Sequence, residues 1–151
     1  MIPAAARRLA GLVAAARAVF DAVAAASSVG LGKGPRGGGR NPDQIIGHVI
    51  SADAAYARKL GVQRKQPAAD GITATAQLRQ TSAAVLAAPS VGSPLVPGGW
   101  TTCYAARRIA WHVLEHAWEI QTGDSQVTLP RRANPASYAA TTSRARPPRR
   151  A

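Results

Sequence analysis

Residues 105–120 read AARRIAWHVLEHAWEI, and the apolar residues in this stretch recur at the spacing of an α-helix. One face of that helix carries Ala105, Ile109, His112, Val113, His116 and Ile120. His112 and His116 are four residues apart, which is about one helical turn, so both imidazoles project from this apolar face. The pattern predicts a helix from about residue 102 to residue 121 that ends near Gly123.

A second group of apolar residues lies on the opposite side of the same helix. It consists of Trp111, Leu114 and Trp118. A helix that is apolar on both sides is usually buried on both sides. We therefore expect this second face to be covered, either by another copy of the chain in a homodimer or by the chain's own segment from Pro94 to Trp100.

Three further helices are predicted along the chain. Their ranges are about residues 4–26, 41–60 and 71–88. Asn41 is a favourable N-cap, Pro42 suits the first helical position, and Gln44 completes a capping-box pattern. The composition is rich in alanine and poor in alternating β-branched residues, which favours an all-α protein. We expect a four-helix bundle at residues 1–124 and a disordered basic tail at residues 125–151, which lack helical periodicity and contain four prolines.

The chain has a formal net charge of +12, which at first suggests a nucleic-acid partner. Six of its nineteen lysine and arginine residues lie in the predicted tail. They are Arg131, Arg132, Arg144, Arg146, Arg149 and Arg150. The tail contains no acidic residue, and Tyr138 is its only aromatic residue. Non-specific contact is therefore the most that we expect with nucleic acid, and the tail should be dispensable for folding.

The single cysteine and the apolar N-terminal stretch indicate in which cellular compartment the protein is expected. The single cysteine, Cys103, excludes an internal disulfide and fits a reducing environment. The apolar stretch near the N-terminus resembles an export signal, but Arg17 and Asp21 interrupt it. No helical stretch combines the roughly 18 apolar, uncharged residues that a membrane-spanning helix requires. We expect a cytoplasmic protein with no membrane partner.

The third histidine, His48, lies one turn after Ile45 in the helix that begins at Asn41. Placed beside His112 and His116, it would complete a three-nitrogen metal site with one coordination position left open. A single buried histidine is usually a hydrogen-bonded core residue, but two on one apolar face have few protein partners for their ring nitrogens. A metal ion satisfies one nitrogen of each ring, and a nearby acceptor orients the other. The candidate acceptors are Glu115, Glu119 and Asp53.

The segment from His112 to His116 also matches the H-x-x-E-H pattern of inverzincin peptidases, in which Glu115 would be the general base. Those enzymes need another acidic ligand far downstream, and here only Glu119 and Asp124 follow. The peptidase interpretation is therefore disfavoured.

Three segments carry a resemblance to a known family. They are NPDQIIGHV at residues 41–49, YARKLG at residues 56–61 and AARRIAWHVLEHAWE at residues 105–119. They resemble the DinB-like superfamily, which includes mycothiol-dependent maleylpyruvate isomerases and bacillithiol transferases. The resemblance covers about residues 5–122 and implies a four-helix bundle with one histidine on the second helix and an H-x-x-x-H pair on the last. His48, His112 and His116 match those positions. Members of known function often use the metal, in many cases zinc or nickel, to activate a low-molecular-weight thiol.

The resemblance implies a divalent-metal protein that acts as a thiol-dependent transferase or isomerase. Its partners would be a thiol such as mycothiol and an electrophilic small molecule. The glycine-rich basic loop at residues 32–40 is either a plain surface loop or a rim on which Arg36 and Arg40 guide an acidic ligand to the metal. Two other functions stay open. One is a metal-dependent hydrolase with Glu115 or Glu119 as the base, and the other is a metal-stabilised binding protein without turnover.

Overall fold

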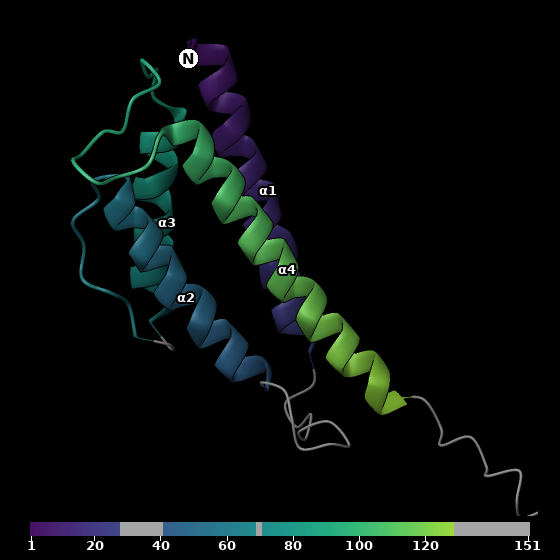
Figure 1. Ribbon diagram of the computed structural model, residues 1–151. Helices are drawn as coiled ribbons and strands as arrows, with labels where there is room; N and C mark the ends of the chain where they lie inside the picture. The colour runs from purple at the N-terminus through teal and green to yellow at the C-terminus, as the bar shows by residue number, and fades with distance from the viewer. Residues whose placement is uncertain (28–40, 69–70, 129–151) are drawn as a thin grey trace, which may run out of the picture.

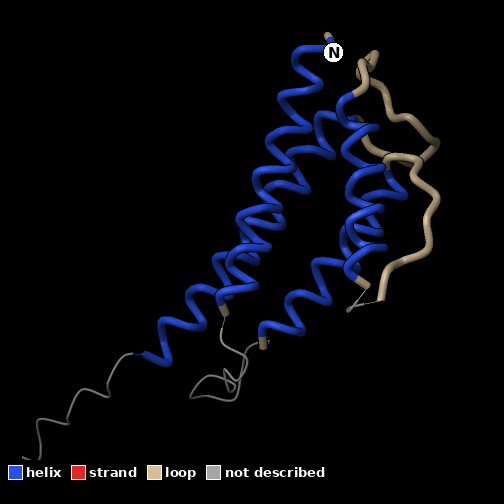
Figure 2. The backbone as a smooth tube through the Cα atoms, turned by 180° about the vertical axis from the view of Figure 1, so that it is seen from behind, coloured by secondary structure: helices blue, strands red, loops and turns tan. Residues whose placement is uncertain are grey.

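The computed structural model describes residues 1–27, 41–68 and 71–128, with side chains described up to residue 123. Its helices are α1 (Pro3–Ala26), α2 (Pro42–Lys59), α3 (Ile72–Ala87) and α4 (Thr102–Thr128). Figure 1 and Figure 2 show these helices gathered into one bundle, with loops but no strand in the part of the chain that is described. The predicted all-α four-helix bundle is confirmed.

The ends of α2 follow directly from its sequence. Asn41 Oδ1 accepts the backbone N–H of Gln44 at 2.8 Å, and Gln44 Oε1 accepts the backbone N–H of Asn41 at 3.1 Å. This is the predicted capping box, and it satisfies N–H groups that a helix start leaves without a helical partner. At the other end Gly61 has a φ of 81°, a conformation that glycine adopts at little cost and that turns the chain out of the helix.

α4 continues beyond its predicted end. It runs through Gly123 to Thr128. A glycine inside a helix costs only about 1 kcal/mol relative to alanine, and an established helix gains a hydrogen bond with each residue that is added. The boundary predicted between residues 124 and 125 therefore falls inside α4. The rest of the predicted tail, residues 129–151, lies outside the described residues.

All four helices contribute to one apolar core. Its largest fully buried apolar side chains are Val13, Phe20, Ile45, Val49, Leu78, Leu86, Ile109 and Val113. α1 packs against α3 and α4, and α2 packs against the same two helices. α1 and α2 therefore face each other across the bundle rather than along a shared side.

α1 is long and apolar enough to cross a membrane by length and composition alone, and it is the one helix of the described residues that passes this test. In the structure, Val13, Ala16 and Phe20 on α1 are buried in the bundle core. A helix that forms one side of such a core can have the same composition. Length and composition therefore do not distinguish α1 as a spanning helix.

Charged side chains join α1, α2 and α3 in the interior. Arg17 Nη2 on α1 lies 2.7 Å from Asp53 Oδ1 on α2. Arg79 Nε on α3 lies 2.8 Å from Asp53 Oδ2, and Arg79 Nη1 lies 2.9 Å from Asp21 Oδ1 on α1. Burial by itself lowers the pKa of Arg79, but the carboxylates of Asp53 and Asp21 outweigh it and raise that pKa above its ordinary value. Because Asp53 is 2% exposed and Arg17 is 6% exposed, these charges are stable only as a paired set.

The second apolar face of α4 is exposed in the single chain, so the alternative in which the segment from Pro94 to Trp100 covers it is wrong. Trp111 is 52% exposed and Trp118 is 67% exposed. The segment from Pro94 to Trp100 packs elsewhere, because Trp100 donates its backbone N–H to Lys59 O at 2.9 Å and its ring lies against Tyr56. That segment therefore covers the end of α2 and leaves the outer face of α4 open.

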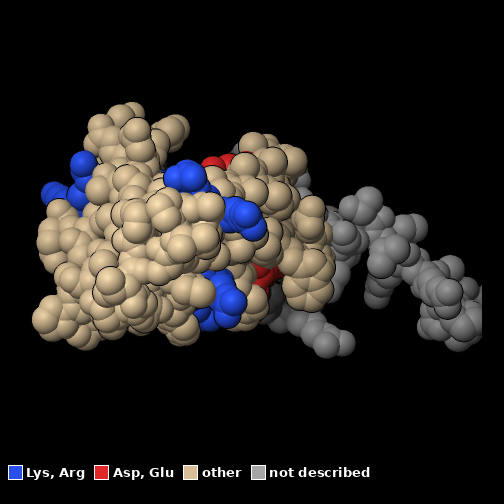
Figure 3. Space-filling view, turned by 90° about the horizontal axis from the view of Figure 1, so that it is seen from above, with Lys and Arg blue, Asp and Glu red and all other residues tan. Residues whose placement is uncertain are grey.

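Positive charge also lies on the bundle itself and not only in the predicted tail. Figure 3 shows several areas of Lys and Arg atoms, and smaller areas of Asp and Glu atoms, on the end of the bundle seen from above. The exposed basic residues of the bundle include Arg7, Arg8, Arg58, Lys59, Arg64, Lys65 and Arg107. The described surface therefore favours anionic ligands.

Asp53→Ala should lower the free energy of unfolding by about 3–5 kcal/mol, because it leaves Arg17 buried without its counter-charge. Asp21→Ala is the matched control, since the Asp21 side chain is 57% exposed and an exposed ion pair contributes about 0–1 kcal/mol. Urea denaturation followed by circular dichroism gives both values. Equal losses of unfolding free energy in the two variants would show that the buried ion pair stabilises the fold no more than the exposed one.

Candidate metal site

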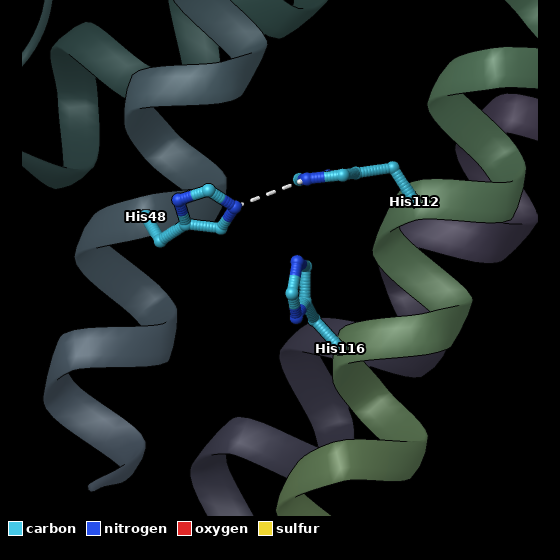
Figure 4. Close-up of side chains that lie close together, drawn as sticks. All are labelled: His48, His112 and His116. Atoms are coloured by element: carbon cyan, nitrogen blue, oxygen red, sulfur yellow. Dashed lines mark hydrogen bonds between the residues drawn. The ribbon is translucent and has the colours of Figure 1, made fainter. Parts of the chain in front are cut away.

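The three histidines converge between α2 and α4. His48 comes from α2, and His112 and His116 come from successive turns of α4 (Figure 4). Each ring offers one nitrogen as a ligand, and these three nitrogens lie within 4.8 Å of one another. His48 Nε2 and His112 Nε2 are 3.3 Å apart. The predicted cluster is therefore present, and its donor set can hold a metal ion.

The cluster has a buried side and an exposed side. His112 and His116 are each 6% exposed, because they lie on the face of α4 that also carries the buried Ile109 and Val113. His48 on α2 is exposed. The cluster therefore lies at the edge of the core, and an exchangeable ligand can reach it along the His48 side.

Glu119 fixes the orientation of His116. His116 Nδ1 and Glu119 Oε2 are 2.7 Å apart. Nδ1 therefore carries the ring proton and donates a hydrogen bond to the carboxylate. The Nε2 lone pair of His116 is then available as a ligand. Glu119 is one of the three acceptors predicted from the sequence, and it contacts His116 because residues three apart on a helix are neighbours on its surface.

His112 is neutral at physiological pH. Burial lowers its pKa from the ordinary value of 6.5 to about 4. The electrostatic effects of His116, His48 and Arg108 contribute to that lowering, and the carboxylate of Asp53 opposes them. A neutral imidazole keeps a lone pair for a metal ion. Because two ring nitrogens face each other at 3.3 Å, a proton or a cation between them is needed to offset the repulsion of their lone pairs. The donor set therefore fits a metal ion.

An aromatic row closes the side of the cluster nearest the loop before α4. The Tyr56 ring meets the His112 ring edge-on, with centroids 5.4 Å apart, and Trp100 follows at 5.1 Å from Tyr56. Tyr104 continues the row at 5.0 Å from Trp100. The spacing of apolar residues does not predict this row, because Trp100, which links Tyr56 to Tyr104, lies in the loop before α4. The row shields one side of His112 from water.

The remaining described candidates are either exposed or engaged with other residues. Glu115 is exposed. Both carboxylate oxygens of Asp53 bond to arginines rather than orienting a ligand, because that carboxylate faces α1 and α3. Cys103 is exposed in the first turn of α4. Arg36 and Arg40, the predicted cofactor-binding residues, lie outside the described residues.

A separate cavity of about 490 Å³ opens between α1, α2 and α3. Its walls include Phe20, Ile46, Ile50, Thr75 and Arg79. None of the three histidines lines it, and Arg79 is already paired with two carboxylates. The histidine cluster, not this cavity, brings together groups with catalytic or ligand chemistry.

Comparisons with protein-family models, curated proteins and solved structures find no match to this chain.

In metal-free protein, stability should fall as the pH is lowered from about 6.5 toward 4. His112 has an ordinary pKa of 6.5 when the chain is unfolded and a pKa of about 4 when it is folded. Between these values the unfolded chain binds a proton that the folded chain does not, so acid favours unfolding. Urea denaturation of chelator-treated protein at several pH values measures this slope. His112→Gln should flatten the slope in this window, and an unchanged slope in that variant would contradict the assignment to His112.

Proposed function

We propose that this chain is a divalent-metal protein of the DinB-like type and that His48, His112 and His116 hold the ion. One observation carries the proposal: three imidazole nitrogens from two helices lie within 4.8 Å of one another. Histidines that only fill a core have no reason to point their ring nitrogens at a common centre. Imidazole nitrogen suits zinc and nickel among the divalent metals, and three protein ligands leave a position open for a further ligand.

The activity that we propose is a transfer or isomerisation that uses a low-molecular-weight thiol. A divalent ion lowers the pKa of a thiol bound to it, so the sulfur is present as the nucleophilic thiolate at neutral pH. The chain's own contribution is to hold the donors ready. Glu119 keeps the proton of His116 on Nδ1, and His112 stays neutral. The exposed side at His48 admits the thiol and an electrophilic substrate.

The proposed thiol rests on the resemblance, and the proposed electrophile rests on the charge of the surface. The resemblance points to a thiol such as mycothiol. The basic surface of the bundle, shown in Figure 3, favours an electrophile that carries an acidic group. Arg108, whose charge acts on His112, is the basic residue of α4 best placed to attract such a group.

The positions of two glutamates disfavour a metal-dependent hydrolase. Glu119 Oε2 already accepts a hydrogen bond from His116 at 2.7 Å, so that oxygen is occupied. Glu115 is exposed on α4, while His112 and His116 lie on the buried face of that helix. A general base must reach the proton that it removes, and Glu115 on the outer surface does not meet that condition.

Metal analysis tests the site. Wild-type protein should bind one equivalent of zinc or nickel, and His112→Ala should abolish binding because two imidazoles hold the ion poorly. Glu119→Gln should weaken metal affinity by about 10–100-fold, as is typical when the acceptor that orients a histidine ligand is lost. Glu115→Gln is the matched control on the same helix and should bind as the wild type does. A His112→Ala variant with wild-type metal content would refute the site.

A thiol-plus-electrophile assay tests the activity. Turnover by the metal-loaded protein should require the thiol and should disappear in His112→Ala. Hydrolysis that proceeds without a thiol would favour the hydrolase instead. A full metal site without turnover over a broad panel of thiols and electrophiles would indicate a metal-stabilised binding protein.

A further inference from the structure

The outward face of α4 carries an exposed apolar row with the spacing of a helix-pairing surface. Tyr104 is 53% exposed, Trp111 is 52% exposed, Leu114 is 42% exposed and Trp118 is 67% exposed. These residues recur at intervals of seven, three and four, which is the heptad pattern by which one helix packs against another. Isolated exposed apolar residues are ordinary on a protein surface, but four large ones on one face of one helix indicate an interaction surface.

The charges beside this row indicate what covers it. Arg107 and Arg108 precede Trp111, and Glu115 follows it on the same helix. The Arg108 guanidinium lies 4.6 Å from the centre of the Trp111 ring, a cation–π contact that orders the indole. A second α4 placed parallel would set arginine against arginine. A second α4 placed antiparallel would set arginine against glutamate, so the surface is complementary to itself in one orientation only.

We propose that α4 pairs with α4 of a second copy of this chain in an antiparallel arrangement, with Trp111 at the twofold axis. Tyr104 then faces Trp118 of the other copy, and Arg107 faces Glu115, because each pair is equally spaced on either side of Trp111. A twofold axis presents every such contact twice. The exposed apolar row is covered, and each Glu115 meets an Arg107 of the other copy.

The expected dimer is a weak one. A fully covered aromatic side chain buries about 150–250 Å², and Tyr104, Trp111 and Trp118 are each between half and two-thirds exposed. Covering these three would bury on the order of 300 Å² per copy, with Leu114 and the flanking charges adding to it. Standard interfaces bury about 800 Å² per partner. The dissociation constant should therefore lie in the micromolar range.

Charge exchange across the proposed axis tests both the partner and its orientation. Sedimentation velocity with a reducing agent present, because Cys103 is exposed, should show wild type as a dimer at tens of micromolar. Arg107→Glu and Glu115→Arg should each raise the dissociation constant at least tenfold, because each places like charges together at two symmetric positions. The double variant should return to within about threefold of the wild type. Arg8→Glu, an exposed charge reversal on α1, is the matched control and should change nothing.

Three results would overturn the proposal. One is a wild type that stays monomeric at 100 micromolar, roughly the top of the expected range. The second is a dimer that persists unchanged in Trp118→Arg. The third is a double charge variant that stays as weak as the single variants, because that would exclude the antiparallel register. Circular dichroism and metal content of each variant, both expected to match the wild type, separate a lost interface from a lost fold.

Discussion

The buried carboxylate of Asp53 is the constraint on which the arrangement of the helices depends. A carboxylate that is only 2% exposed is stable as an anion only when its charge is compensated and its oxygens are hydrogen-bonded. Arg17 and Arg79 meet both conditions at 2.7 and 2.8 Å, and they come from two other helices. The pairing therefore limits how α1, α2 and α3 rotate and slide against one another. Apolar packing alone is less selective, since similar side chains can exchange neighbours at little cost.

This constraint reaches the histidine cluster through α2. His48 precedes Asp53 by five residues, which corresponds to roughly 140° around a helix. With Asp53 directed at Arg17 and Arg79, His48 is directed toward α4, where it meets His112 at 3.3 Å (Figure 4). The orientation of an exposed ligand is thus set from inside the bundle. A change in the ion pairs would therefore move a site that shares no atom with them.

α4 carries different chemistry on its two faces. Its core face holds His112 and His116 in an apolar setting that keeps the first of them neutral. Its outer face holds the exposed apolar residues Tyr104, Trp111, Leu114 and Trp118. The two glutamates divide accordingly, because Glu119 orients a histidine while Glu115 lies on the exposed side. Pairing of two α4 helices would stiffen the element that carries two of the three proposed ligands without adding a residue to the site.

Features that depend on near neighbours along the chain were predictable from the amino-acid sequence. The four helices, the capping box at Asn41 and the common face of His112 and His116 all follow from spacings of three or four residues, because one helical turn brings such residues together. The predicted end of α4 near Gly123 was wrong for the same local reason. The small cost of one glycine is outweighed by the hydrogen bonds that an established helix gains as it extends.

Contacts between residues far apart in sequence became known only from the folded arrangement of the helices. The pairing of Arg17 with Asp53 spans 36 residues, and the meeting of His48 with His112 spans 64. Periodicity states which face of a helix is apolar, but it does not state which helix lies opposite or how each is rotated. Those choices depend on the fit of all side chains at once. For that reason the sequence did not predict that Trp111 is exposed. It also did not predict that Asp53 pairs with arginines instead of a histidine.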